Sequence, residues 1–411
     1  MVKGFSPYKP HRPHTLRFKG SVIPTAIIPT IVVTIVAAVV TVVHHKTSIK
    51  LGIANTFISV LGLVVGLLLT YRTNTAYDRY YEGRRLWSTL SVGIRNITRY
   101  IWVCVSLSEE EKKHEKKDLE KRTNILEIEK KKAIKLLAGF AIAVKHYLRE
   151  EYAYDKDDQL KTLVSNVKLD SPDYWPKGIE SSDITNRKKK PHLRGKGDNI
   201  PNYNLPLEIS LFLSSYIHTQ MKKKRIDAPT CNSLLQNLNV LVDCLSNFER
   251  ILRTPIPLAY SIHLNQVVWI YCLSLPFQLV ATTGWATIAV VFFATFVLIG
   301  IERIGAEIEN PFGLDENDLD LDGFCRIIDE EVKIITSRTA PKTIDWVHTE
   351  ENHPFDDQKI NALQAGKLPL SEVKSKLPNS AKNSMDIDRE QVSGGVDQNS
   401  SQNLNEVKVE K

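Results

Sequence analysis

The sequence predicts an all-α membrane protein, with four transmembrane helices that extend into a cytosolic helical bundle. Three observations support this fold class. The apolar residues gather in long stretches that contain no Asp, Glu, Lys or Arg. These stretches form two pairs that are separated by a long polar region. The polar region repeats apolar residues at intervals of three and four, the period of an amphipathic helix, and shows no long strand-like alternation.

The charge-free stretches cover residues 22–43, 51–71 and 261–301. A helix needs about 20 apolar residues to cross a bilayer, so the first two stretches each predict one span. The third stretch is long enough for two spans, and the Thr-Thr-Gly sequence at 282–284 supplies the turn between them. Buried helices of a soluble protein are the alternative, but their apolar runs are usually about 10–14 residues long.

The spans divide the chain into six segments. In order, these are an N-terminal arm (1–20), a first transmembrane helix pair (21–71), a cytosolic helical region (72–252), a second transmembrane helix pair (253–304), an acidic loop with a cytosolic helical segment (305–365) and a disordered tail (366–411). The cytosolic region carries two charged inserts, 107–132 and 182–200, of which the first is either a solvated helix or a loop. The tail is polar with few aromatic residues, a composition typical of disorder.

Charge indicates the orientation of the chain. The first 20 residues carry five basic and no acidic side chains, a bias that places the N-terminus in the cytosol. An even number of spans then places the C-terminus in the cytosol as well. We expect an integral, multi-pass membrane protein, in the plasma membrane by default because no organelle signal is present. For the basic run at 187–190, contact with anionic lipid is a better interpretation than nucleic-acid binding.

The sequence does not predict an enzyme. It contains no nucleophile motif, P-loop, zinc-protease motif or dinucleotide-binding fingerprint. The five cysteines are scattered and include no CxxC pair, which argues against a zinc site or a disulfide framework.

The second predicted span carries an apolar stripe. Leu63, Leu67 and Tyr71 follow one another at intervals of four, so they lie on one helix face. Gly62 and Gly66 form a parallel stripe of small residues, which allows close approach of another helix. In a single copy, the apolar stripe would be a packing face. In a ring of identical subunits, it would line a hydrophobic constriction that gates by dewetting. These residues alone leave both interpretations open.

A second candidate site follows the fourth predicted span, where residues 309–322 read ENPFGLDENDLDLD. Pro311 and Gly313 end the span in a tight turn. The acids that follow could supply the oxygen ligands that calcium prefers, although their spacing is not that of an EF-hand. Capping of the next helix by an Asp side chain and plain solvated charge are the alternatives. Calcium is the one cofactor that the sequence suggests.

Four motifs placed around the spans resemble the bestrophin family of ion channels. RFKGSVIP precedes the first span, RTNTAYDR leads into EGRRLW after the second, IPLAYSIH precedes the third, and IENPFG with NDL follows the fourth. These motifs fall within residues 17–24, 72–87, 256–263 and 308–319. The resemblance covers residues 15–335 apart from the two inserts, and it is nearest to the plant, fungal and bacterial branches.

The resemblance implies a homopentamer with one central pore that passes chloride and other monovalent anions. By position, the narrow hydrophobic neck of the family falls on Leu63, Leu67 and Tyr71, which favours the pore-lining interpretation of the stripe. A second, deeper constriction falls on Ile209. Two alternatives stay open. One is a cation-selective channel, as some bacterial members are, and the other is a membrane scaffold that recruits partners through the charged insert and the tail.

The resemblance also bears on calcium, because animal members bind this ion just after the fourth span. Asn310, Asp315 and Asp318 line up with the animal motif, and Glu307 is a candidate carbonyl donor. The unbroken acidic run of the animal motif is interrupted here, for example at Asn317.

Overall fold

The computed structural model forms two compact units, Met1–Ser337 and Arg338–Lys411, which are described separately. The residues that the structure describes are 18, 20–47, 51, 56–113, 115–151, 157–164, 204–355 and 360–376. Nearly all of the expected N-terminal arm, the basic insert at 182–200 and residues 377–411 of the expected tail lie outside the described residues.

Four helices of the first unit carry the predicted spans. They are α1 (Ile23–Lys46), α2 (Thr56–Cys104), α9 (Leu258–Thr283) and α10 (Thr287–Glu307), with a short 3-10 turn, η3 (Gly284–Ala286), between the last two. Within the described part of the chain, two stretches are long and apolar enough to cross a membrane, namely Ile23–Lys46 and Leu258–Glu307. The turn begins at Gly284, whose φ of +55° is left-handed and therefore suits glycine.

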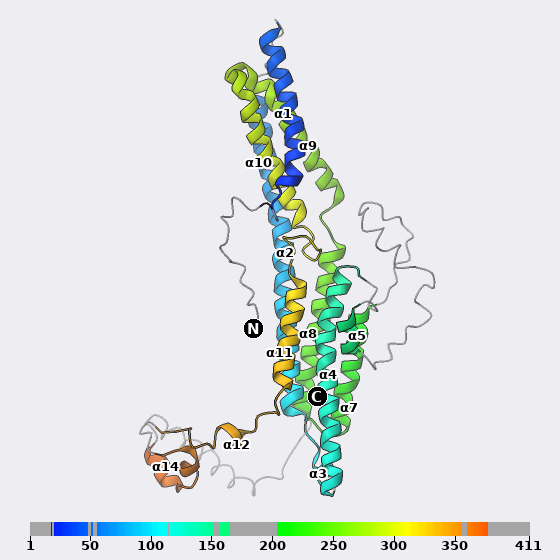
Figure 1. The fold of residues 1–411 in the computed structure, drawn as a ribbon, viewed down its shortest axis with the longest axis vertical. Coiled ribbons are helices and arrows are strands. Elements are labelled where there is room, and N and C mark those ends of the chain that lie inside the picture. The colour runs from blue at the N-terminus through cyan, green and yellow to red at the C-terminus, as the bar shows by residue number, and fades with distance from the viewer. Residues whose placement is uncertain are drawn as a thin grey trace, which may run out of the picture. The chain divides into compact units, whose positions relative to one another are not determined.

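The four helices pack around a shared apolar core. Figure 1 shows α1, α9 and α10 grouped around one end of α2. The core consists of small and branched side chains from all four helices, which allow the backbones to approach closely. Its fully buried members include Ala26, Val33, Ala37, Val65, Leu69, Leu264, Val268, Cys272, Val291 and Ile299.

Helix α2 joins the two ends of the unit. It runs without interruption over 49 residues and contains no proline, so the predicted second span and the amphipathic segment after it are one helix. At its far end α2 packs against α4 (Lys116–Leu148), α8 (Ala228–Arg253) and α11 (Leu321–Thr336) (Figure 1). Because α2 is one continuous helix, the position of its apolar half also determines the position of its polar half.

The polar end of the unit is a helical bundle, as the sequence predicts. Besides α4, α8 and α11, it contains α3 (Glu109–Lys112), α5 (Asp158–Val164) and α7 (Leu205–Lys222). Asp227 caps α8 by accepting from the backbone N–H of Thr230 at 3.3 Å, and Asp320 caps α11 through Gly323 at 2.8 Å. The capping role that the sequence allowed for an Asp of the acidic loop is therefore confirmed for Asp320.

The charged insert at 107–132 is helical rather than a loop. Its described residues contribute α3 and the first half of α4, which continues into an apolar segment that starts at Ala133. Ser108 and Glu111 form a reciprocal capping box at the start of α3. Ion pairs between residues four apart, such as Arg122 with Asp118 at 3.0 Å, support the solvated part of α4.

The described residues of the second unit form three short helices, α12 (Thr343–Trp346), α13 (Ala362–Ala365) and α14 (Leu370–Lys376). Helix α14 lies inside the segment 366–411, for which the composition predicted disorder. The expectation is therefore wrong at its beginning, where Pro369 precedes the helix and the backbone N–H of Val373 bonds to its carbonyl at 3.2 Å.

Candidate pore face and the junction beneath it

The apolar stripe of α2 faces away from the rest of its own subunit. Leu63, Leu67 and Tyr71 are 76%, 70% and 61% exposed, whereas Val65 and Leu69 on the opposite face are buried in the four-helix core. A row of large apolar side chains exposed along one helix requires a cover outside the subunit, either lipid or other subunits. Among the described residues, Leu63 and Leu67 are thus not part of a packing face within the chain.

The glycine stripe has two different environments. A Cβ added to Gly62 would lie 3.0 Å from the Tyr271 hydroxyl, so this glycine lets α9 approach α2 closely. A Cβ added to Gly66 would meet nothing within 4 Å. The expected close approach of a helix is confirmed at Gly62, and within the described part of this subunit Gly66 takes no part in it.

Tyr260, at the start of α9, contacts the stripe at Tyr71. Its ring packs edge-on against Tyr71 with centroids 5.5 Å apart. Its hydroxyl donates to the carbonyl of Leu68 at 3.1 Å. The position of Tyr71 therefore depends on the entry turn of α9.

A buried ion pair lies directly behind Tyr71. The Nη1 atom of Arg72 is 2.9 Å from the Glu302 carboxylate, and the two side chains are only 6% and 7% exposed. Glu302 also lies 3.3 Å from Arg303, and Arg72 lies 3.8 Å from Glu309. Charges at the edge of an apolar helix bundle require partners, because an unpaired buried charge is very costly. This pair therefore ties α2 to α10.

Arg79, two turns further along α2, caps the end of α8. Its guanidinium donates to the carbonyls of Ile251 at 2.6 Å, Thr254 at 2.5 Å and Glu309 at 2.9 Å. The last carbonyls of a helix have no partner within it, so these bonds satisfy groups that would otherwise be orphaned. The Glu309 carboxylate in turn accepts from the backbone N–H of Ile256 at 3.1 Å.

These contacts bring together three of the four sequence motifs, which lie far apart in the chain. We call this set the junction; it consists of Arg72, Arg79, Thr254, Ile256, Tyr260, Glu302 and Glu309. Sequence reasoning did not identify Arg72 or Glu302 as a pair. Both residues are charged and lie at the ends of predicted apolar spans, a position that by itself indicates a functional role.

The expected position of the second constriction is wrong. Ile209 lies on α7 and is completely buried inside the subunit, so its side chain cannot line an opening. Leu207 and Leu211 of α7, on the opposite face, are exposed instead. Periodicity could not decide between these faces, because both carry apolar residues.

The acidic loop after α10 is anchored by an aromatic side chain. Phe312 is fully buried and packs against Phe248 with ring centroids 5.6 Å apart. Gly83 of α2 makes room for it, since an added Cβ would lie 3.0 Å from the Phe312 ring. The Asn-Pro-Phe-Gly motif is therefore a structural anchor that fixes where the following acids begin.

The expected calcium ligands lie close together but are already engaged. Asp318 accepts from the backbone N–H of Asp315 at 2.8 Å, and Asn310 accepts from that of Phe312 at 3.4 Å. Burial raises the pKa of Asp318 to about 6, and the negative charges of Asp315 and Glu307 act in the same direction. Within the described residues, no three His, Cys, Asp or Glu side chains are grouped so that they could hold a metal ion.

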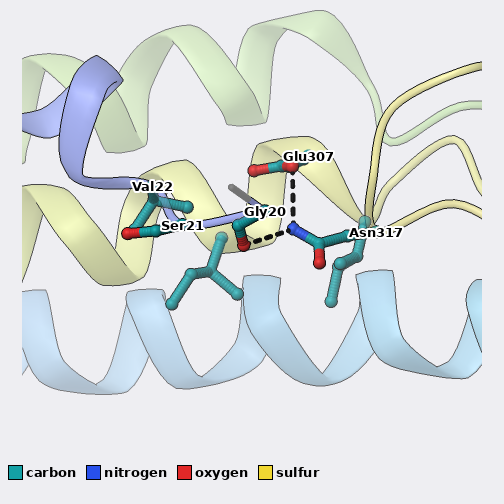
Figure 2. Close-up of a pocket in the computed structure, with 7 residues that line it drawn as sticks. Gly20, Ser21, Val22, Glu307 and Asn317 are labelled. Atoms are coloured by element: carbon teal, nitrogen blue, oxygen red, sulfur yellow. Dashed lines mark hydrogen bonds between the residues drawn. The ribbon is translucent and has the colours of Figure 1, made fainter. Parts of the chain in front are cut away.

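A cavity of about 240 Å³ lies beside these residues, where the loop meets the start of α1. Figure 2 shows Asn317 pointing between Gly20 and Glu307, with its amide bonded to both. The lining residues are Gly20, Ser21, Val22, Ile304, Glu307, Ile308 and Asn317. Calcium requires six to eight oxygen ligands, whereas Gly20, Glu307, Asn310 and Asp318 each have an oxygen that already accepts from an N–H group. The arrangement does not fit a calcium ion.

Together, the helices α1, α2, α9 and α10 and the helical bundle beyond them define an all-α membrane protein. The chain belongs to the bacterial and fungal bestrophin family. The family pattern described as "Bacterial/Fungal Bestrophin protein" matches residues 7–334. This match includes all of the helices that carry the apolar stripe and the junction, and it agrees with the expectation that the protein is not an enzyme.

Curated relatives and solved structures agree with this assignment. A protein of Nostoc sp. named "Voltage-dependent anion channel-forming protein" is 39% identical over 275 residues, which cover 67% of this chain and 75% of that protein. A protein of Synechocystis sp. with the same descriptive name is 36% identical over 314 residues, 76% of this chain and 87% of the relative. A bacterial bestrophin homolog from Klebsiella pneumoniae shares the fold, with a TM-score of 0.57 and 20% identity over 76% of this chain and all of that one.

Proposed function

We propose that this protein is a passive channel for monovalent anions such as chloride, assembled as a homopentamer with four spans in each subunit. The observation that carries the proposal is the exposed apolar stripe on an uninterrupted helix. In a ring of identical subunits, Leu63, Leu67 and Tyr71 would face one axis and form a hydrophobic neck that gates by dewetting. The names of the cyanobacterial relatives support an anion as the permeant ion.

Two charged residues, one basic and one acidic, lie on the same face of α2. A helix repeats its orientation every 18 residues, so Arg85 lies five turns below Leu67 on the side that would face the pore. Arg85 is exposed, and in the described part of the chain it is the only arginine of α2 whose side chain contacts no partner. Asp78 is also exposed on this face, and its negative charge would counteract the effect of Arg85 on anions. Arg85 would raise and Asp78 would lower the local concentration of anions, so the anion preference rests on the names of the relatives.

The proposal includes an orientation. Both termini and the helical bundle would lie in the cytosol, because the basic N-terminal segment favours that side. The six-segment division of the chain and the plasma membrane as its location are parts of the same proposal.

Reconstitution of the purified protein in planar bilayers tests the channel. We expect currents whose reversal potential follows the chloride gradient, and a particle mass of five subunits. A reversal potential that follows the cation gradient would support the cation-selective alternative. Absence of ion flux, combined with partner capture that depends on residues 107–132, would support the scaffold.

Variants of the neck test its assignment. Leu63→Ala, Leu67→Ala and Tyr71→Ala each remove an exposed side chain from the stripe, so each should increase conductance or the open fraction, because a wider neck wets more easily. Val103→Ala is a matched control, since Val103 is also exposed on α2 but lies at its far end. Unchanged currents in all three neck variants would refute the assignment.

A further inference from the structure

We infer that the Asn317 side chain latches the acidic loop of this protein to the start of α1 and does so in place of a bound cation. The Nδ2 atom of Asn317 donates to the carbonyl of Gly20 at 3.0 Å and to the carboxylate of Glu307 at 2.9 Å. Figure 2 shows the amide between these two oxygens. A single side chain therefore joins the segment before α1, the end of α10 and the loop.

The chemistry of the two acceptors determines which way the amide points. A backbone carbonyl has no proton to donate, and an ionised carboxylate accepts only. The Oδ1 atom of Asn317 would face two like partial charges if the amide were turned over. The NH2 group, which has two protons, satisfies both acceptors at once.

Gly20 is adapted to this contact. Its φ of +76° lies in the left-handed region, which other residues rarely adopt. A Cβ at this position would lie 3.4 Å from Asn317 Oδ1 and 3.5 Å from the Glu316 side chain. Glycine therefore allows the chain to turn its carbonyl toward the loop and allows the amide to approach.

Two oxygens that could otherwise ligate a cation, the Gly20 carbonyl and one oxygen of the Glu307 carboxylate, accept from the Asn317 amide. The side chains of Asp318 and Asn310 each accept from a backbone N–H group of the loop itself, and within the described residues no three His, Cys, Asp or Glu side chains are grouped to hold a metal ion. The loop is consequently closed by hydrogen bonds alone, and its closure should not respond to calcium.

Replacing Asn317 separates the latch from an ion site. Asn317→Ala removes both hydrogen bonds, so the loop should be less stable whether or not calcium is present. Asn317→Asp places a second carboxylate beside Glu307 and the Gly20 carbonyl, an arrangement that repels itself unless a cation lies between them. The two variants should therefore differ in their response to calcium.

The experiment measures thermal unfolding of the full-length protein in detergent, in EGTA and in millimolar CaCl2. We expect the wild-type midpoint to be the same in both, the Asn317→Ala midpoint to be lower by several degrees in both, and the Asn317→Asp midpoint to be lower in EGTA and raised by calcium. Asn239→Asp, an identical change at an exposed position of α8, is the control and should not respond to calcium.

Two results would overturn the latch. A wild-type midpoint that rises with calcium would show that an ion binds the native loop, and this measurement needs no variant. An Asn317→Ala midpoint equal to the wild-type value would show that the two hydrogen bonds do not stabilise the folded protein. Because the readout is stability and not ion flux, the latch can fail while the channel proposal stands, and the reverse also holds.

Discussion

Replacement of Arg72 by methionine should lower the free energy of unfolding by about 3–5 kcal/mol, the usual cost of removing one partner of a buried ion pair. Methionine retains much of the apolar volume, so little of this loss would come from a cavity. The Glu302 carboxylate, only 7% exposed, would keep Arg303 at 3.3 Å but lose its 2.9 Å bond to Arg72. The cost is thus mainly that of a buried, under-compensated charge.

A double-mutant cycle distinguishes this mechanism from a general loss of packing. Adding Glu302→Leu to Arg72→Met leaves neither charge of the pair buried, so the double variant should be more stable than the sum of the two single losses predicts, with a coupling energy of roughly 2 kcal/mol. Chemical unfolding in detergent micelles, followed by tryptophan fluorescence, measures each corner of the cycle.

The matched control is the pair of Arg95 and Glu331, which lies at a similar distance of 2.8 Å but has side chains 48% and 36% exposed. Solvent screens such a pair, so Arg95→Met should cost no more than about 1 kcal/mol. If Arg72→Met cost as little as Arg95→Met, or if the two changes in the cycle were additive, the reasoning from burial would be refuted.

Three further outcomes are expected. Tyr260→Phe removes the hydroxyl bond to α2 but keeps the ring, so single-channel recordings should show altered open times with unchanged selectivity. Unaltered open times would contradict the dependence of Tyr71 on the entry turn of α9. Arg85→Gln should shift the reversal potential toward the cation value, and Asp78→Asn should shift it away from that value. A reversal potential that stays unchanged in both variants would exclude a pore-facing position for these residues. Hydrogen bonding to Arg225 lowers the pKa of Glu111 from 4.5 to about 2. Because solvent screens this pair, the contribution is only about 1 kcal/mol. It is present above pH 4.5 and is lost as pH falls toward 2, so the stability difference between wild type and Glu111→Gln should shrink across that range; a constant difference would contradict it.

The sequence by itself determined the helical class, the order of the spans and the stripe on α2. These features depend on local periodicity and on apolar length, which the chain expresses without reference to distant residues. Capping by Asp320 was also readable, because a cap and its target lie within one turn. Composition was less reliable at the start of the tail, where a helix at Leu370–Lys376 forms within a polar segment.

Only the tertiary structure decided which partners meet. Arg72 and Glu302 are 230 positions apart, and nothing local in either segment specifies the other. Ile209 illustrates the same restriction, because α7 has apolar residues on both faces and only its packing against α4 and α8 shows which face is buried. The acidic loop is a third case. Its composition suggested calcium, yet the Asn317 amide donates to the Glu307 carboxylate and to the carbonyl of Gly20, almost 300 residues away, a contact that only the fold brings about.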